Sequence, residues 1–371
     1  MPDLKNSSIS DFKEQMSDRL SNYYSSKIGQ INSILDTVIP VTLDKTILKI
    51  MTDEFDTPFG LDRTDKAIYQ LMRQYLSNRG KLFRPLLTYL FIEGYGKDPE
   101  DFKPIVASAE IIHSCSLILD DIADASLLRR GQPCSHQLHG IPRAANASSA
   151  MTFFVYRLLQ KVPMDLSNDQ KIKLYKALLW EHYITSIGSA LDLGWVKERK
   201  NEIPEDVYIQ HIKFRSSSYT YRHASSLGAI TGGASEEDLK LIFDYSSVLG
   251  VAFQFMDDIL NLKPGLQTWG KTIGEDITEG KRSPLVLHTL KTADTKDKDR
   301  LMKLLDSKVT SNVELEEAVN ILDKYHAFET VKEQADQFAL KACNIIERIQ
   351  IADKHKHLLI DFAKYVVERK I

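Results

Sequence analysis

The sequence has few of the features that mark secreted, membrane or nucleic-acid-binding proteins. Its 371 residues include 48 Lys and Arg against 51 Asp and Glu, a formal net charge of -3, so no overall basic field attracts nucleic acid. Three cysteines, Cys115, Cys134 and Cys343, are an odd number in a long chain, which argues against a disulfide framework and indicates a reducing compartment. Charged residues interrupt the longest apolar runs well before about 18 residues, so we expect no transmembrane segment.

The two ends of the chain also lack targeting features. The first residues, MPDLKNSSISDFKEQ, contain no apolar signal core and include acids that transit peptides avoid. The last four residues, ERKI, do not form a prenylation sequence. Together with the cysteine usage, these observations predict a cytoplasmic protein.

Strand signals are scarce as well, whereas apolar residues recur at helical spacing throughout. The sequence therefore predicts an all-α fold. Apolar residues from Ile9 to Val38 follow steps of three and four and stop before Pro40, which predicts an amphipathic helix that packs on the body or on a partner subunit. The other predicted helices cover roughly residues 42–53, 64–78, 82–95, 102–124, 144–161, 168–193, 205–232, 236–262, 281–291, 297–306, 313–325 and 328–369.

No low-complexity linker and no short-period repeat divides the chain. We therefore expect an N-terminal amphipathic helical extension, residues 1–41, followed by one all-α domain, residues 42–371.

Two aspartate-rich segments, LILDDIAD and FQFMDDILN, are the most informative features of the chain. Residues three and four apart share a helix face, so Asp120 and Asp121 lie with Asp124, and Asp257 and Asp258 lie on one face with the residue that ends the second segment. Both segments end strongly apolar runs that must face a core, where carboxylates are seldom found without a cation. Mg²⁺ is the oxygen-loving ion that also bridges to substrate phosphates, so the pattern predicts a magnesium site.

Basic residues accompany the acids along the chain. Arg129 and Arg130 follow the first segment by about one loop, and Arg forks suit phosphate oxygens. Lys81 and Arg84 stand one helical turn apart at the start of a predicted helix, where the helix dipole also favours anions. His113 lies two turns before the first acids on the same face, and Gly-Lys pairs follow the second segment.

Each of these features alone has an ordinary structural interpretation. A lone Asp cluster is commonly a solvated helix end, an Arg pair a polar loop, and a histidine on an apolar helix a satisfied core residue. Their joint order is more specific: a basic pair, a histidine, an acid cluster, an arginine pair, a second acid cluster and a Gly-Lys pair. That order predicts a site for a phosphate-bearing substrate.

The ordered set resembles the trans-isoprenyl diphosphate synthases, also called polyprenyl synthetases. Residues 80–85 resemble the family's GKxxRP, residues 113–133 its first aspartate-rich region ending in RRGxP, and residues 188–195 its GQxLDxxW stretch. Residues 253–261 and 270–281 resemble the second aspartate-rich region with its trailing GK pairs. The resemblance covers about residues 75 to 290, and geranylgeranyl diphosphate synthases are the most similar members.

Four positions depart from the family pattern. Arg215 replaces a Lys that holds the allylic diphosphate, and Ser216 replaces the following Thr. Ser189 replaces a Gln, and Asn261 replaces the last Asp of the second region, as in some geranylgeranyl synthases.

The resemblance implies a helical bundle of the isoprenoid synthase fold around a central cavity, with a role for each matching residue. The residues expected to hold two or three Mg²⁺ ions, or Mn²⁺ in their place, are Asp120, Asp121, Asp124, Asp257 and Asp258. With Arg129 and Lys271 they form the expected catalytic set. The residues expected to bind isopentenyl diphosphate or an allylic diphosphate are Lys81, Arg84, His113, Arg129, Arg130, Arg215, Ser216, Gln254, Lys271 and Lys281.

The implied activity is head-to-tail condensation of isopentenyl diphosphate with dimethylallyl, geranyl or farnesyl diphosphate, by a homodimer. Cys115 and Ser116, one turn deeper than Asp120, are both small, which favours a product of about twenty carbons. We expect Phe153, Phe154 and Tyr156 to form the floor of the cavity. Two alternatives remain: a class I terpene synthase of the same fold, and a non-catalytic subunit of a heteromeric synthase.

Overall fold

The computed structural model describes residues 13–39, 43, 48, 60–161, 165–262, 274–307 and 311–370. Its elements confirm the all-α prediction: within these ranges the only strands are β1 (Leu128–Arg129) and β2 (Gln132–Pro133), which form one short antiparallel hairpin. Most of the helix expected over 42–53, and the residue Lys271, lie outside the described residues.

The chain divides into two compact units. The α7 unit comprises Asn22–Leu178 and His223–Leu239, and the α13 unit comprises Met1–Ser21, Leu179–Arg222 and Lys240–Ile371. The predicted boundary between an N-terminal extension and the main domain, near residue 41, stays a prediction.

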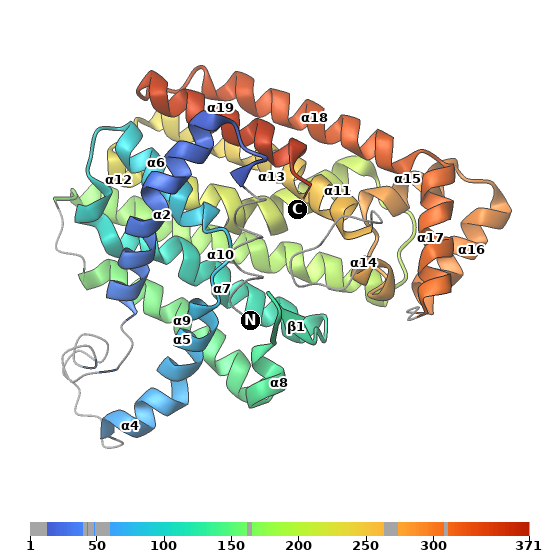
Figure 1. Cartoon of the computed structure of the whole chain (residues 1–371), viewed down its shortest axis with the longest axis horizontal. Coiled ribbons are helices and arrows are strands. Elements are labelled where there is room, and N and C mark those ends of the chain that lie inside the picture. Colours follow the sequence, from blue (N-terminus) through green and yellow to red (C-terminus); the bar gives the residue numbers. More distant parts are fainter. Residues whose placement is uncertain are drawn as a thin grey trace. The chain divides into compact units, whose positions relative to one another are not determined.

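The α7 unit is built around α7, which packs most extensively against α9, while α6 packs against α12 (Figure 1). The core consists of apolar residues on these helices, and all three residues Ile105, Ala109 and Ile111 of α7 are fully buried. Its elements are the main part of α2 (Asp18–Val38), α4 (Gly60–Thr64), η1 (Asp65–Tyr69), α5 (Gln70–Ser77), α6 (Phe83–Gly94), η2 (Pro99–Phe102), α7 (Lys103–Ala123), β1, β2, α8 (Ser135–His139), α9 (Ile141–Lys161), the first turns of α10 (Asn168–Lys197), α12 (His223–Gly232) and the first turn of α13 (Glu236–Leu262).

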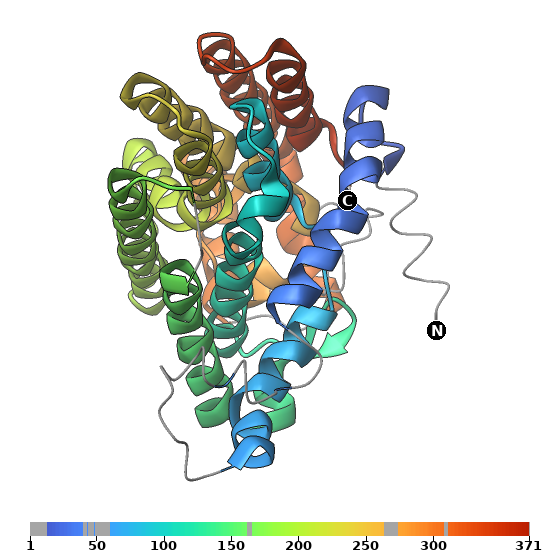
Figure 2. The ribbon, with the colours of Figure 1, turned by 90° about the vertical axis from the view of Figure 1, so that its left-hand side faces the viewer.

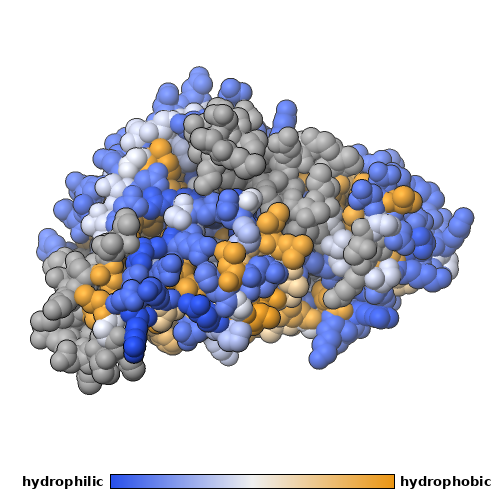
Figure 3. Space-filling view, turned by 60° about the horizontal axis from the view of Figure 1, so that its bottom comes forward, coloured by the Kyte–Doolittle hydropathy of each residue, from blue (hydrophilic) through white to orange (hydrophobic). Residues whose placement is uncertain are grey.

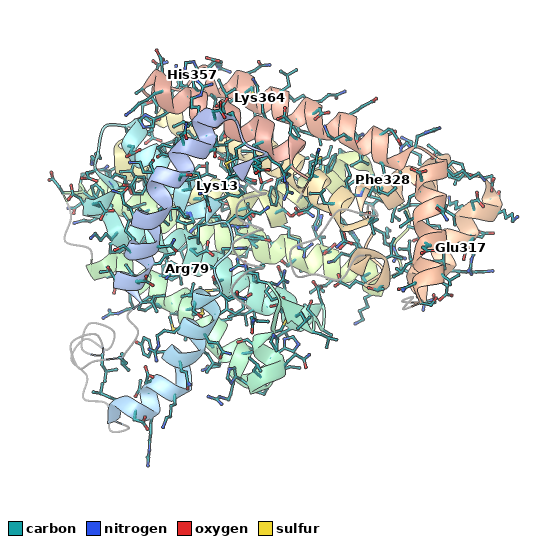
Figure 4. The ribbon with its side chains drawn as sticks, viewed as in Figure 1. Lys13, Arg79, Glu317, Phe328, His357 and Lys364 are labelled. Carbon is teal, nitrogen blue, oxygen red and sulfur yellow. The ribbon has the colours of Figure 1, made fainter. Side chains whose placement is uncertain are left out.

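Within this unit, α2 lies along α6, as Figure 2 shows. Tyr23 and Lys27 of α2 both contact the carboxylate of Glu93, at 2.8 and 2.6 Å. Two residues farther along α2, Asn32 and Asp36, are contacted by Arg79, which follows α5 (Figure 4). Arg79 donates a hydrogen bond of 2.7 Å to Asn32 and forms an ion pair with Asp36. The predicted amphipathic N-terminal helix therefore packs on the body of its own chain, and it ends at Val38, as predicted from Pro40.

The α13 unit holds α13 and the C-terminal helices, with α18 and α19 side by side (Figure 1). Its elements are the later turns of α10, α11 (Glu205–Ile212), η3 (Lys213–Arg222), most of α13, α14 (Glu275–Thr278), α15 (Pro284–Thr292), α16 (Thr295–Asp306), α17 (Asn312–Lys324), α18 (Ala327–Ile346) and α19 (Asp353–Glu368).

Three predicted helices are wrong in detail. The stretch 64–78 contains the π-helix η1 before α5 begins. The stretch 205–232 is not one α-helix, because ten of its residues form the π-helix η3, a rare geometry that is frequent at functional sites. The stretch 328–369 breaks between α18 and α19, where Ile349 and Ile351 are both buried.

One described helix, α13, is long and apolar enough to span a membrane by length and composition, and 61% of its apolar window is buried inside the protein. Core helices of globular proteins meet the same criterion. The expected absence of a transmembrane segment stays a prediction.

Candidate active site

The first aspartate-rich segment forms the C-terminal end of α7. Asp120 and Asp124 are half-buried, and Asp124 caps the helix through its own amide, which donates to the carbonyl of Asp120 at 2.8 Å. The C-terminal end of a helix carries partial negative charge, and the last turn of α7 contains no basic residue. Two carboxylates in this field are suited to binding a cation.

Asp121 differs from its two neighbours, because it is only 1% exposed and is engaged by a side chain of the protein. Arg129 donates from Nε, at 2.8 Å, and from Nη2 to the same oxygen, Oδ1. Tyr75 donates to the other oxygen at 3.4 Å. Burial opposes the charged state of Arg129, but the Asp121 carboxylate outweighs it and raises the pKa of the guanidinium. In this arrangement Asp121 orients Arg129.

The β1–β2 hairpin sets the position of the arginine pair. Its two turn residues, Arg130 and Gly131, both have positive φ, 53° and 73°, as a tight hairpin turn requires. Arg130 donates to the carbonyl of Asn78 at 2.6 Å, and Asn78 donates back to the carbonyl of Arg129 at 3.2 Å. The hairpin is thereby attached to the segment that leads into Lys81 and α6.

A cluster of cations surrounds the middle of α7. Burial raises the pKa of Glu110, while Arg130, Arg84 and Arg79 oppose this effect, and Arg130 lies 3.8 Å from the Glu110 carboxylate. His113, one turn farther along α7, has its pKa lowered well below the ordinary value by burial and then by Arg84 and Arg130. The arginines near Glu110 and His113 outnumber the single carboxylate, and His113 is neutral. This excess of positive charge is suited to binding an anion.

The second aspartate-rich segment ends α13. Asp258 is buried, and Gln254 donates to its Oδ1 at 2.8 Å, while Ser216 donates to Gln254 at 2.5 Å. Its other oxygen, Oδ2, is buried without a hydrogen-bond partner among the described residues. Burial raises the pKa of Asp258 well above its ordinary value, and the neighbouring Asp276 and Asp257 add to the effect. Crowded carboxylates with an unsatisfied oxygen fit a divalent cation.

Asn261, which replaces an aspartate of the family pattern, has a structural role here. Its side-chain oxygen accepts from the amide of Asp276 at 3.2 Å, and its carbonyl accepts from Gly274 at 3.0 Å. These bonds hold α14 against the end of α13, and with it Asp276 and Lys281, whose Nζ lies 3.4 Å from Asp276.

Arg215 lies on η3 and pairs with Asp192 of α10, with 2.8 Å between Nη1 and Oδ2. Burial opposes ionisation of Asp192, but Arg215, and then His211 and Lys281, hold its pKa below the ordinary value. A Cβ atom on Gly188 of α10 would lie 2.6 Å from the backbone nitrogen of Arg215, so only glycine permits this approach of α10 to η3.

The structure places the predicted residues that it describes in two sets, one in each compact unit. The set in the α7 unit is Lys81, Arg84, His113, Cys115, Ser116, Asp120, Asp121, Asp124, Arg129 and Arg130. The set in the α13 unit is Arg215, Ser216, Gln254, Asp257, Asp258 and Lys281.

The sequence interpretation missed four residues that contact these sets: Glu110, Asp192, Asp276 and Arg369. Two of them stood inside motifs already recognised, since Asp192 lies in the GQxLDxxW stretch and Asp276 between the two trailing GK pairs. An acid five residues before Lys281 was the available signal for Asp276. Nothing in the local sequence pointed to Arg369, because its partner is distant along the chain.

Among the described residues, no group of three or more His, Cys, Asp and Glu side chains is arranged as a metal site. The donor types nevertheless fit Mg²⁺, because both sets offer carboxylate oxygens and Asp258 has an unsatisfied one.

An all-α protein with two acid clusters, each accompanied by cations, has side chains whose chemistry suits a phosphorylated substrate. The polyprenyl synthetase family model matches residues 65–322. A short chain isoprenyl diphosphate synthase of Methanothermobacter thermautotrophicus is 30% identical, over 86% of this chain and 96% of the relative. A geranylgeranyl diphosphate synthase of Sulfolobus acidocaldarius is 29% identical, over 82% and 84% of the two chains.

The fold is shared too. The crystal structure of the geranylgeranyl pyrophosphate synthetase from Pyrococcus horikoshii superposes with a TM-score of 0.78 at 25% identity, covering 95% of this chain and 98% of that one. The chain belongs to the polyprenyl synthetase family. It is accordingly an enzyme of the trans-prenyltransferase class, with the isoprenoid synthase fold.

Proposed function

We propose that this enzyme condenses isopentenyl diphosphate with an allylic diphosphate to give geranylgeranyl diphosphate, of twenty carbons. The observation that carries the proposal is the cation cluster around His113 in the α7 unit, two turns from Asp120. An enzyme that only ionises a prenyl diphosphate needs the acids but has no use for a second anion site.

The proposal assigns the allylic diphosphate to the acids. Asp120, Asp124 and Asp257 would hold two or three Mg²⁺ ions, or Mn²⁺, with Asp258 in support. When bound, such ions neutralise the diphosphate and make it a better leaving group. Arg215 would add fixed positive charge, together with Lys271, which lies outside the described residues.

The second diphosphate is assigned to the cation cluster. Lys81, Arg84, His113 and Arg130 would bind isopentenyl diphosphate and direct its double bond at the allylic carbon. Asp121 would keep Arg129 extended toward the substrate, as its two hydrogen bonds to that guanidinium support. Surrounding apolar residues would exclude water, which otherwise converts the allylic cation to an alcohol.

Product length is proposed to depend on α7 below the first acids. Cys115 is buried, and its thiol donates to the carbonyl of Ile111 at 3.0 Å, while Ser116 is half-buried. Phe154 is buried as expected, but Phe153 is 67% exposed, which is incompatible with the predicted floor of a closed cavity. The prediction is therefore wrong for Phe153.

We infer that the enzyme is a homodimer joined through α10. Ile172, Leu179 and Tyr183 are spaced by seven and four residues, share one face of this helix, and are all exposed, as is the adjacent Trp180. A second copy is a fitting occupant, because a helix face repeated by symmetry can contact itself. Hydrophobic side chains also reach the surface on the face drawn in Figure 3.

The dimer inference is tested by sedimentation equilibrium. We expect Leu179→Lys with Tyr183→Lys to give a monomer, while the exposed Val313→Lys on α17 leaves the dimer intact. A wild-type monomer at micromolar concentration contradicts the inference.

We also propose a cytoplasmic location and a single domain after residue 41. The cysteines form no disulfide within the part of the chain that the structure describes, and Cys115 and Cys134 are buried, which suits a reducing compartment.

One experiment separates the proposed activity from its alternatives. Purified protein is incubated with Mg²⁺ and dimethylallyl, geranyl or farnesyl diphosphate, with and without isopentenyl diphosphate, and products are identified by mass. Incorporation of isopentenyl units up to twenty carbons supports the proposal. Hydrocarbon or alcohol formed without isopentenyl diphosphate indicates a terpene synthase, and inertness indicates a non-catalytic subunit. Asp120→Asn should abolish turnover, whereas the exposed Asp101→Asn should not.

A further inference from the structure

We propose that Arg369, near the C-terminal end of the chain, is a positioning residue that sets the carboxylate of Asp257 for metal binding. The inference rests on the proposed function, in which Asp257 is a ligand for Mg²⁺. Arg369 Nη2 pairs with Asp257 Oδ1, although the two residues lie 112 residues apart in the sequence.

Arg369 is fixed by contacts that do not involve Asp257. Its side chain is 7% exposed, and its guanidinium lies 4.1 Å from the centre of the Phe253 ring. Nη2 also donates to the carbonyl of Phe253 at 3.2 Å, and Nε donates to the carbonyl of Val366 at 3.3 Å. Stacking and two backbone acceptors therefore hold the arginine, and the arginine in turn holds the aspartate.

The aspartate remains accessible despite this contact. The Asp257 side chain is 42% exposed, so the carboxylate that Arg369 orients still faces solvent. Asp257 adjoins Asp258 in the sequence, so without a fixed cation the two carboxylates would repel each other. Arg369 offsets that repulsion and fixes one side-chain orientation before a metal ion arrives.

A direct measurement of metal binding tests the idea without turnover. Mn²⁺ is titrated into protein saturated with inorganic diphosphate, and free Mn²⁺ is followed by electron paramagnetic resonance. Loss of a side chain that orients a metal ligand typically weakens metal binding by about 10- to 100-fold, which we expect for Arg369→Gln. Arg369→Lys keeps the positive charge but loses the forked guanidinium, so its affinity for Mn²⁺ should lie between those of the wild type and Arg369→Gln. Lys370→Gln removes a neighbouring, exposed charge and should bind as the wild type does.

Kinetics supply a second readout. Raising the Mg²⁺ concentration should restore turnover of Arg369→Gln, because the ligand is still present, but not turnover of Asp257→Asn. In a double-mutant cycle, Arg369→Gln should add no further loss of Mn²⁺ affinity on the Asp257→Asn background.

Unchanged or tighter Mn²⁺ binding by Arg369→Gln overturns the proposal, and tighter binding would instead indicate that the arginine competes with the metal. Circular dichroism of the metal-free variants checks folding, and if Arg369→Gln does not fold, Arg369→Lys carries the comparison. A wild-type protein that binds Mn²⁺ but consumes no isopentenyl diphosphate refutes the proposed function while leaving the role of Arg369 measurable.

Discussion

The buried ion pair between Glu181 of α10 and Arg222 of η3 gives a prediction with a definite sign. Arg222 donates to Glu181 Oε2 from Nη2 at 2.8 Å and from Nε at 3.1 Å, and its guanidinium lies 4.6 Å from the centre of the Phe243 ring. Both side chains are 4% exposed. Burial raises the pKa of Glu181 from 4.5 to about 7, and the opposing effect of Arg222 is too small to prevent it.

The contribution of Glu181 to the stability of the protein should therefore fall as pH rises. Unfolded Glu181 loses its proton near its ordinary pKa of 4.5, whereas the folded protein retains that proton until about pH 7. Between these values the folded state binds more protons, so the free energy of unfolding decreases with pH and levels off above the folded pKa. A pKa difference of one between the folded and unfolded states changes the free energy of unfolding by about 1.4 kcal/mol. The shift of Glu181 therefore changes it by roughly 3 kcal/mol between pH 4.5 and about pH 7.

The perturbation is Glu181→Gln, which imitates the protonated side chain and removes the titration. Urea unfolding followed by tryptophan fluorescence, from about pH 5 to about pH 8.5, gives the free energy of unfolding of both proteins. We expect similar values at the acid end and a growing advantage for Glu181→Gln toward the alkaline end. Glu198→Gln, at an exposed position just beyond α10, should leave the wild-type pH dependence unchanged. A wild type that instead gains stability over Glu181→Gln with rising pH refutes the reasoning, because that is the behaviour of a pair that depresses the carboxylate pKa.

Four further predictions concern the site. Asp121→Asn should lower the free energy of unfolding by about 3 kcal/mol or more, because it leaves Arg129 buried without its charge partner; thermal unfolding that matches the wild type would contradict the pairing. Gly188→Ala should raise the KM for the allylic substrate by displacing Arg215, whereas Gly194→Ala on the same helix, where a Cβ meets nothing within 4 Å, should not; equal KM values would count against the contact. Cys115→Phe should shorten the product, which mass spectrometry would detect, and an unchanged chain length would place Cys115 in the core alone. Chelation with EDTA should abolish turnover and Mg²⁺ should restore it; activity that survives complete chelation would rule out the metal-dependent chemistry.

Much of the α7 unit could be predicted from the sequence, because its signals are local. Helical spacing and capping residues lie within a few turns of the elements they specify, so α6 and α7 begin and end within a residue or two of the predictions, as does α13 of the other unit. The acids and cations of the first region also lie close together along the chain, which made their association readable.

The remaining features depend on contacts between distant segments. The π-helix η3 contains neither Gly nor Pro to mark it, and it is held by neighbours that come from elsewhere in the chain. Asp121 could not be distinguished from Asp120 by pattern, since only the burial of its side chain and the approach of Arg129 separate them. The pairing of Arg369 with Asp257 joins segments 112 residues apart, beyond the reach of any spacing rule.

The contacts of η3 restrict how its sequence can change. A Cβ on Gly188 would meet Arg215 and a Cβ on Gly250 would meet the Cα of Ser217 at 2.5 Å, so α10 and α13 both touch the backbone of η3, at positions two residues apart. The π-turns of η3 hold more residues than α-turns, and deleting one residue there would relax them toward ordinary α geometry. The backbone that Gly188 and Gly250 approach would then shift, so changes in the length of this segment should be tolerated less readily than substitutions of its side chains.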